Sequence, residues 1–260
     1  MMGAIHQQYS RQGRRARPAR SRPALPTLRI GAIAPARRPG AIVAQDRSAM
    51  PTYAFHDLEF PMNHPSFFDT AARITMYDPL AELLGAADKG LIDYSYTEVV
   101  KLAGHSCPTV AGAYLMTFKA LKHLYGDGVP QRGAIKVEFR NDQLNGVTGV
   151  IANVVGLITG ATVDNGFKGL AGKYDRRNLM SFNAPVDGEM RFQRLDTGAQ
   201  ATVSFNAGVV PGSPALMPAL HRVLAGAATQ EERDGFARDW QERVARILEN
   251  AGHPELVTCA

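Results

Sequence analysis

The stretch AGHSCPTVAGAYLMTFKALKHLYG, residues 103–126, decides the fold. Its apolar side chains recur at helical spacing after Pro108 and stop at Gly126. They are Val110, Tyr114, Leu115, Phe118, Leu121 and Leu124. Proline in the first turn and glycine after the last turn are typical helix boundaries. The stretch therefore predicts a buried helix of about 16 residues that begins at the step from Cys107 to Pro108.

The turn before this helix carries an imidazole and a thiol. His105 and Cys107 are two positions apart, so both side chains can point at one place. The free N–H groups of a helix N-terminus favour a thiolate, and imidazole with thiolate is a ligand pair for zinc, iron or copper. His105 and Cys107 are thus candidate metal ligands and also candidate catalytic residues. The alternative is that Cys107 packs as a small buried apolar residue.

The remaining segments predict an α+β domain. A short helix is expected after Asp78, its N-cap, and residues 134–140 alternate like a half-buried strand. A second buried helix is predicted at 148–158, strands at 178–182, 189–196 and 201–205, and a C-terminal helical extension at 214–250. We therefore expect residues 50–255 to form one domain with a helix–strand core and a mixed or antiparallel sheet.

The first 49 residues differ in composition from the rest. They contain ten arginines, no lysine and a single acid, Asp46, whereas the following 211 residues carry 19 basic and 23 acidic side chains. Scattered prolines and the lack of apolar periodicity predict a disordered tail. We interpret the tail as upstream sequence translated from an early start codon, with Met50 as the true beginning. An organelle transit peptide is the alternative.

Charge and cysteine content limit which partners and which cellular location we expect. Because the body from residue 50 onward is mildly acidic, nucleic-acid binding is not expected. The longest uncharged run, residues 143–163, contains four glycines and several polar side chains, so no membrane span is predicted. The chain has only two cysteines, Cys107 and Cys259, which fits a reducing environment and predicts a cytoplasmic location.

The segment 103–121 resembles the opening signature of the E-subunit family of formylmethanofuran dehydrogenase, Gly-His-x-Cys-Pro followed by a glycine and a helix. The matching residues are Gly104, His105, Cys107, Pro108, Gly112 and Ala120. A second block, GVIANVVGLITGAT at 149–162, is also similar, and the likeness spans about residues 78–183. The resemblance implies a core shared with glyceraldehyde-phosphate-dehydrogenase-like domains, a homodimer, and an association with enzymes of one-carbon metabolism.

The chain departs from this family at several positions. Thr109 stands where the family usually has glycine, and Val150 and Asn153 stand where many members have cysteine and aspartate. The cysteine-rich zinc ribbon of familiar members is missing. The resemblance implies zinc or another transition metal, and the replacement at Val150 removes one expected ligand.

The aromatic segment after Met50 contains further candidate metal ligands. A zinc site needs three or four protein ligands, so His105 and Cys107 are insufficient by themselves. His56 and His64 are the candidate additional ligands. The alternative is that Asn63-His64-Pro65 forms an ordinary turn.

A basic, glycine-rich loop at 164–177 is the second candidate site. Lys168, Lys173, Arg176 and Arg177 alternate there with Gly166, Gly169 and Gly172. Cations beside flexible backbone predict binding of a small anionic ligand, such as a phosphate, a carboxylate or an acidic pterin-like group. The alternative is a solvated loop with scattered charge.

Two functions follow from these residues. The first is a metal-binding accessory or redox-related protein, in which the His/Cys turn holds the metal and the basic loop holds an anion. The alternative is a non-catalytic dimeric module that carries a metal or a small ligand. Molybdopterin motifs and iron–sulfur cysteine clusters are missing from the sequence, so we do not expect the chain to be a dehydrogenase centre itself.

Overall fold

The computed structural model describes residues 64–260. The predicted tail, residues 1–49, and the candidate ligand His56 lie outside the described residues. Within residues 64–260, helices and strands surround one hydrophobic core, which confirms the predicted α+β class.

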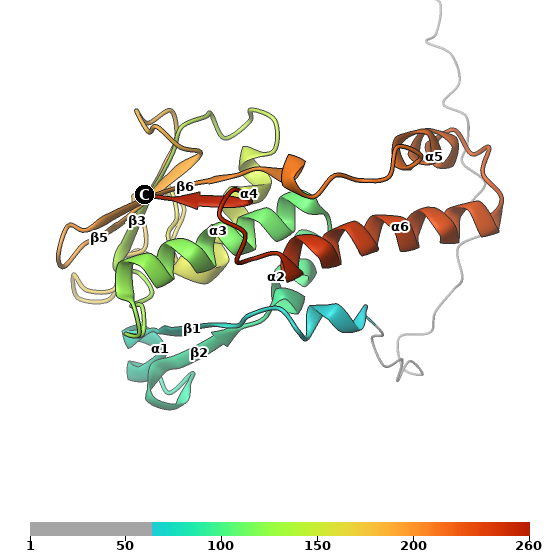
Figure 1. The fold of residues 1–260 in the computed structure, drawn as a ribbon. Helices are drawn as coiled ribbons and strands as arrows, with labels where there is room; N and C mark the ends of the chain where they lie inside the picture. The colour runs from blue at the N-terminus through green and yellow to red at the C-terminus, as the bar shows by residue number, and fades with distance from the viewer. Residues whose placement is uncertain (1–63) are drawn as a thin grey trace, which may run out of the picture. The chain divides into compact units, whose positions relative to one another are not determined.

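A five-stranded sheet forms one layer (Figure 1). Its strand order is β4-β3-β5-β6-β7. The bounds are Ile135–Phe139 for β3, Met180–Ser181 for β4, Met190–Arg194 for β5, Gln200–Phe205 for β6 and Val257–Cys259 for β7. β4 runs parallel to β3 and the other neighbours pair antiparallel, so the sheet is mixed, as predicted. The predicted strands at 189–196 and 201–205 correspond to β5 and β6, which form a hairpin with Gly198 at φ +74° in its turn.

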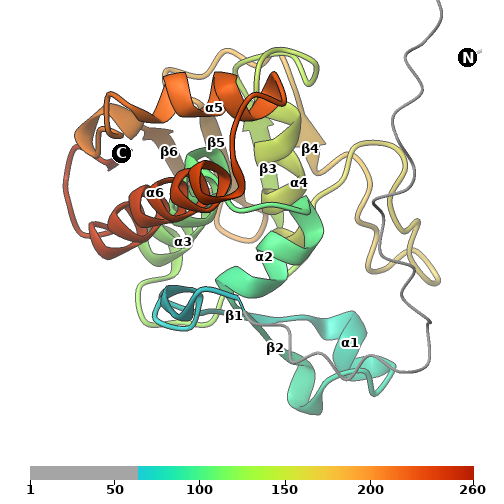
Figure 2. The ribbon, with the colours of Figure 1, turned by 90° about the vertical axis from the view of Figure 1, so that its right-hand side faces the viewer.

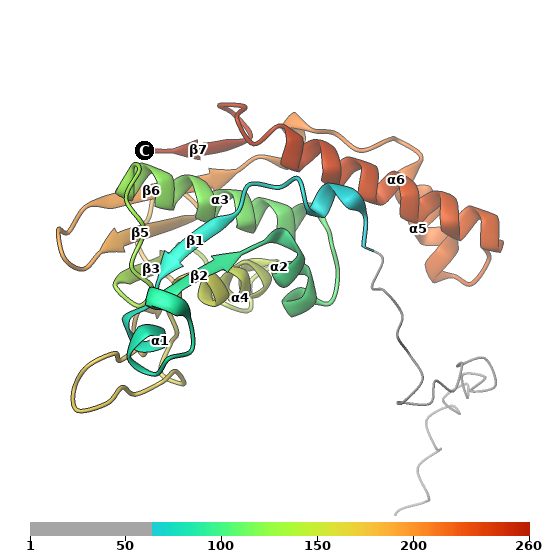
Figure 3. The same cartoon turned by 90° about the horizontal axis from the view of Figure 1, so that it is seen from below.

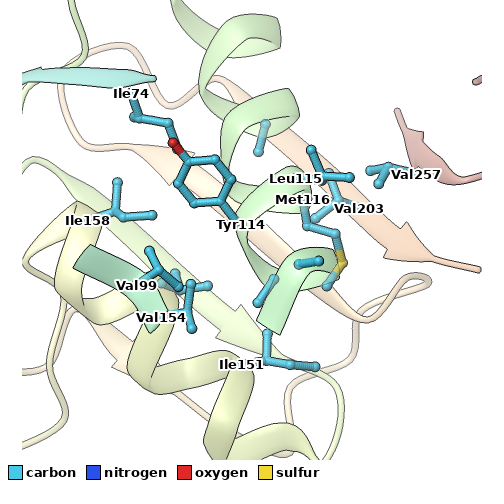
Figure 4. Close-up of a cluster of buried hydrophobic side chains, with 14 of the residues drawn as sticks. Ile74, Val99, Tyr114, Leu115, Met116, Ile151, Val154, Ile158, Val203 and Val257 are labelled. Atoms are coloured by element: carbon cyan, nitrogen blue, oxygen red, sulfur yellow. The ribbon is translucent and has the colours of Figure 1, made fainter. Parts of the chain in front are cut away.

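Two predicted helices form the core together with this sheet. α3 is Pro108–Tyr125 and contacts β6 and β7, while α4 is Thr148–Thr159 and packs on α3. Figure 4 shows apolar side chains from both helices and from the two strands in one cluster. A Cβ at Gly112 would lie only 2.4 Å from the ring of Phe205, so this glycine permits the close contact of α3 with the sheet.

A two-stranded ribbon lies on the other side of α3 (Figures 1 and 3). It consists of β1, Ile74–Tyr77, and β2, Leu91–Tyr94, with the short helix α1, Pro79–Leu83, between them. The hydroxyl of Tyr114 lies 2.6 Å and 3.1 Å from the carbonyl oxygens of Ala72 and Tyr94, which ties α3 to the ribbon. The helix at Asp78 was expected, whereas four-residue strands are too short to produce a clear alternating pattern.

The remaining helices frame the His/Cys turn. α2, Tyr96–Ala103, directly precedes the turn, and α6, Gln230–Glu249, packs on α3 through its C-terminal half (Figure 2). α5, Leu216–Leu224, packs on α6, so the two predicted C-terminal helices are confirmed. Three short 3₁₀ helices complete the described part, at Ser66–Phe68, Asp88–Gly90 and Ala207–Val209. None of the helices in residues 64–260 is long and apolar enough to cross a bilayer.

Candidate functional site

The His/Cys turn connects two helices. Gly104, at φ +72°, ends α2 in the left-handed conformation that glycine adopts without strain. Cys107 is the N-cap of α3 with an extended backbone, and Pro108 occupies the first helical position, as predicted. Residues 104–107 are therefore held at both ends by helix termini.

Cys107 lies at the N-terminus of an 18-residue helix and has not used its side chain as a cap. It is buried, with 9% of its surface exposed, and it is a free cysteine. The helix N-terminus places positive potential beside the thiol. Burial raises the pKa of the second cysteine, Cys259, at the end of β7, and Lys119 only partly offsets that effect.

The imidazole of His105 is exposed, and one of its ring nitrogens forms a hydrogen bond. Its Nδ1 lies 2.9 Å from the carbonyl oxygen of Ala103, and because a carbonyl only accepts, Nδ1 carries the proton. Nε2 then presents a lone pair, and it has no protein partner among residues 64–260. Metal-binding histidines typically hold their other ring nitrogen in this way.

Ser106, between the two candidate ligands, is held by α2 and α6. Its carbonyl oxygen accepts hydrogen bonds from Trp240 Nε1 at 3.0 Å and Gln241 Nε2 at 3.1 Å. Its hydroxyl lies 3.1 Å from the hydroxyl of the buried Tyr96. The contact of Trp240 with Ser106 was not predicted from the sequence. The available signal was the indole N–H, which needs an acceptor when it is buried.

His64 connects to the same turn through aromatic rings. It stacks on Phe68 with 5.4 Å between ring centroids, and Phe68 packs edge-on against Tyr96 at 5.1 Å. Its Nε2 is 3.8 Å from a carboxylate oxygen of Asp69. Within residues 64–260, His, Cys, Asp and Glu side chains nowhere form a group of three that could hold a metal ion.

The four cations of the loop at 164–177 do not share one environment. Leu170 and Lys173 exchange two backbone hydrogen bonds of 2.9 Å, which makes the loop tip a tight hairpin. Lys168 and Lys173 are exposed and form no ion pair in the part of the chain that the structure describes.

The two arginines of this loop already have partners. Arg177 binds Asp175 through Nη2 at 2.7 Å, and this pairing holds the pKa of Asp175 at about 2. Arg176 is buried, and its guanidinium lies 2.7 Å from Asp78. The loop thus offers Lys168 and Lys173 as its free exposed cations within the described residues.

Arg176 belongs to a buried ionic cluster that sequence reasoning missed. Asp78 accepts from Arg176 Nη2 at 2.7 Å and from Arg132 Nη1 at 2.9 Å, and it also caps α1 by accepting from the N–H of Leu80. Burial opposes the charged carboxylate, but the two guanidiniums and the backbone N–H groups hold the pKa of Asp78 below its usual value. A Cβ at Gly133 would lie 1.2 Å from Arg176 Nη1, so glycine is needed there.

No protein-family model and no curated protein sequence matches this chain. The likeness to the formylmethanofuran dehydrogenase family stays a prediction that rests on the residues quoted for it. Function is therefore inferred from the contacts of the described residues.

Proposed function

We propose that this chain binds a transition metal, zinc in the first instance, through His105 Nε2 and the Cys107 thiolate. The observation that carries the proposal is the hydrogen bond from His105 Nδ1 to the Ala103 carbonyl oxygen. It fixes the tautomer in which Nε2 is a neutral donor ligand, and it orients an exposed ring. A soft thiolate two residues later completes a ligand pair suited to zinc.

The surroundings of the turn support a preformed pair of ligands. The N-terminus of α3 stabilises negative charge on Cys107. The two donors from α6 fix the carbonyl of Ser106, so the backbone between the ligands is held in place. Ligands held in position before binding lose less conformational entropy when the metal arrives.

The remaining ligands are His64 and His56 in this proposal. His64 is linked to the turn through Phe68 and Tyr96, and its ring is partly exposed. His56 is eight positions earlier in the chain. A water or a small anion can complete the tetrahedral shell of zinc.

The role that fits this site is that of an accessory or redox-related protein. A metal-bound thiolate can store a metal or protect it during transfer, and metal release exposes a nucleophilic sulfur. Lys168 and Lys173 supply the anion-binding part of the proposal. The alternative is a dimeric module that carries a metal without catalysis. It uses the same ligand pair, and a measurement of catalytic turnover distinguishes the two functions.

Metal analysis tests the ligand assignment. We expect the zinc content of purified protein to fall to background in a His105→Ala, Cys107→Ser double variant. The matched control is a His221→Ala, Cys259→Ser double variant, which removes the same two residue types from α5 and β7. Equal zinc content in all three proteins would overturn the proposal.

Tryptophan emission provides a second, local readout. Trp240 is the single tryptophan of the chain, and its indole donates to the carbonyl between the two proposed ligands. We expect zinc titration to change the emission of the wild-type and control proteins and to leave that of the His105→Ala, Cys107→Ser variant unchanged. An equal response in the ligand variant would place the metal elsewhere.

A further inference from the structure

A separate cavity lies where β3 leads into α4. Its volume is about 210 Å³, which is smaller than the pockets that hold drug-sized ligands. Phe139, Ile151 and Met190 form its apolar part, and Arg140, Asn145 and Glu189 are its main polar lining. The cavity therefore suits a small polar metabolite with a short apolar portion.

Two opposite charges line this cavity without pairing. Neither Arg140 nor Glu189 belongs to an ion pair in residues 64–260, although the backbone N–H of Arg140 donates to the carbonyl of Glu189 at 3.1 Å. Most other charged groups beside this sheet are paired, as Glu138 is with Lys136 and Arg191. An unpaired cation and an unpaired carboxylate in one cavity leave room for a ligand that carries both complementary charges.

The carboxylate of Glu189 is partly withdrawn from water. Burial raises the pKa of Glu189, and the backbone N–H of Phe205 and the charge of Arg140 only partly offset this effect. A partly buried carboxylate that forms no ion pair is stabilised in its charged form when a ligand brings a positive charge to it.

The N-terminus of α4 adds donors on the anion-binding side. This 12-residue helix has no side-chain cap, and the backbone N–H groups of Gly149 and Val150 have no acceptor in the described residues. Val147 and Thr148, at the start of the helix, line the cavity. Free N–H groups and the helix dipole favour a carboxylate at this end.

We propose that this cavity binds a small free amino acid, with its carboxylate held by Arg140 and the N-terminus of α4 and its ammonium group held by Glu189. The apolar wall of Phe139, Ile151 and Met190 receives a short side chain. The site is independent of the metal proposal, because it shares no residue with the His105–Cys107 turn.

Calorimetric titration of the full chain with L-alanine tests this inference. Propionate lacks the ammonium group of the probe, and ethylamine lacks its carboxylate. We expect L-alanine to bind at least about tenfold more tightly than either, because each analogue loses one charge-assisted contact. L-lactate, which keeps the carboxylate but replaces ammonium with hydroxyl, should also bind more weakly.

Substitutions assign the two ends of the ligand. Glu189→Gln should weaken L-alanine at least about tenfold without weakening propionate, whereas Arg140→Gln should weaken both. Arg238→Gln, at an exposed arginine of α6, should change none of the affinities. If Glu189→Gln fails to fold, Arg140→Gln, at an exposed position, and the affinities of the wild-type protein for the ligand series still test the proposal. Absence of L-alanine binding, or equal affinity for L-alanine and propionate, would overturn the proposal.

Discussion

Two helix N-termini in this protein have been used in opposite ways. At α1 the N-cap is Asp78, whose carboxylate accepts from two backbone N–H groups and from the guanidiniums of Arg132 and Arg176. At α3 the N-cap is Cys107, whose side chain makes no capping bond, next to an exposed His105. The carboxylate of Asp78 accepts four hydrogen bonds and serves stability, while the side chain of Cys107 retains unused bonding capacity. A ligand site requires side chains with free donor or acceptor atoms that the surrounding structure holds in position.

Removal of Asp78 should give the largest effect of any single change in this comparison. Asp78→Ala leaves the buried guanidinium of Arg176 and the partly buried one of Arg132 without their shared carboxylate, which costs about 3–5 kcal/mol. Urea unfolding measures the loss. The control is Asp127→Ala, because Asp127 pairs with Lys122 on the open surface, and its removal should change stability little. Similar losses of unfolding free energy in the two variants would show that the ionic cluster at Asp78 stabilises the fold no more than a surface ion pair does.

Acid should weaken the protein through the same cluster. The folded-state pKa of Asp78 lies below its ordinary value of 3.8, so its contribution is present above that pH and is lost as the pH falls below it. We expect the urea midpoint to decline below about pH 4 and the decline to be shallower in Asp78→Asn. An identical acid decline in wild type and variant would assign the effect to other carboxylates.

We call the two hydrogen bonds from Trp240 and Gln241 to the Ser106 carbonyl the α6 clamp. Its loss should lower the free energy of unfolding less than removal of Asp78 does, and it should weaken metal binding. Trp240→Phe removes one hydrogen bond to the Ser106 carbonyl and should cost about 1 kcal/mol. It should also weaken zinc binding, which a competitive chelator titration measures. Arg238→Gln, at an exposed arginine of the same helix that forms no hydrogen bond to Ser106 in the described residues, serves as the control. Unchanged zinc affinity in Trp240→Phe would show that the clamp does not position the ligands.

Cys107→Ser should abolish metal binding, because it replaces the thiolate ligand. Alkylation near pH 7 measures the reactivity of each thiol directly. In metal-free protein Cys107 should react faster than Cys259, and zinc should protect it. Cys259 is the internal control, since burial raises the pKa of its thiol. If Cys107 reacts more slowly than Cys259 with and without zinc, it is a packing residue and the metal proposal fails.

Local signals in the sequence were sufficient for most helices. The proline at the start of α3, the glycine after α4 and the capping box of Thr229 and Glu232 all operate within four positions along the chain. A second capping box, Ser95 with Glu98, marks the start of α2 in the same way and was an available signal that the prediction did not use. The short strands β1, β2 and β7 offered no comparable pattern.

The candidate site was predictable only in part. The positions of His105 and Cys107 at a helix start follow from the motif and Pro108. The state of His105 depends on the carbonyl of Ala103, and the turn depends on Trp240, 134 positions away from Ser106. The cations of the basic loop looked equivalent in the sequence, yet burial separates Arg176 from Lys168 and Lys173.

The sequence by itself determined most of the helical segments, where α3 and α4 begin and end, and that a thiol and an imidazole precede α3. Only the tertiary structure decided that Asp78 meets Arg132 and Arg176, which are 54 and 98 positions away, and that Arg140 and Glu189 share a cavity. The physical reason is range. Caps and helical periodicity act between near neighbours, whereas the pairing of distant charges depends on how the whole chain packs.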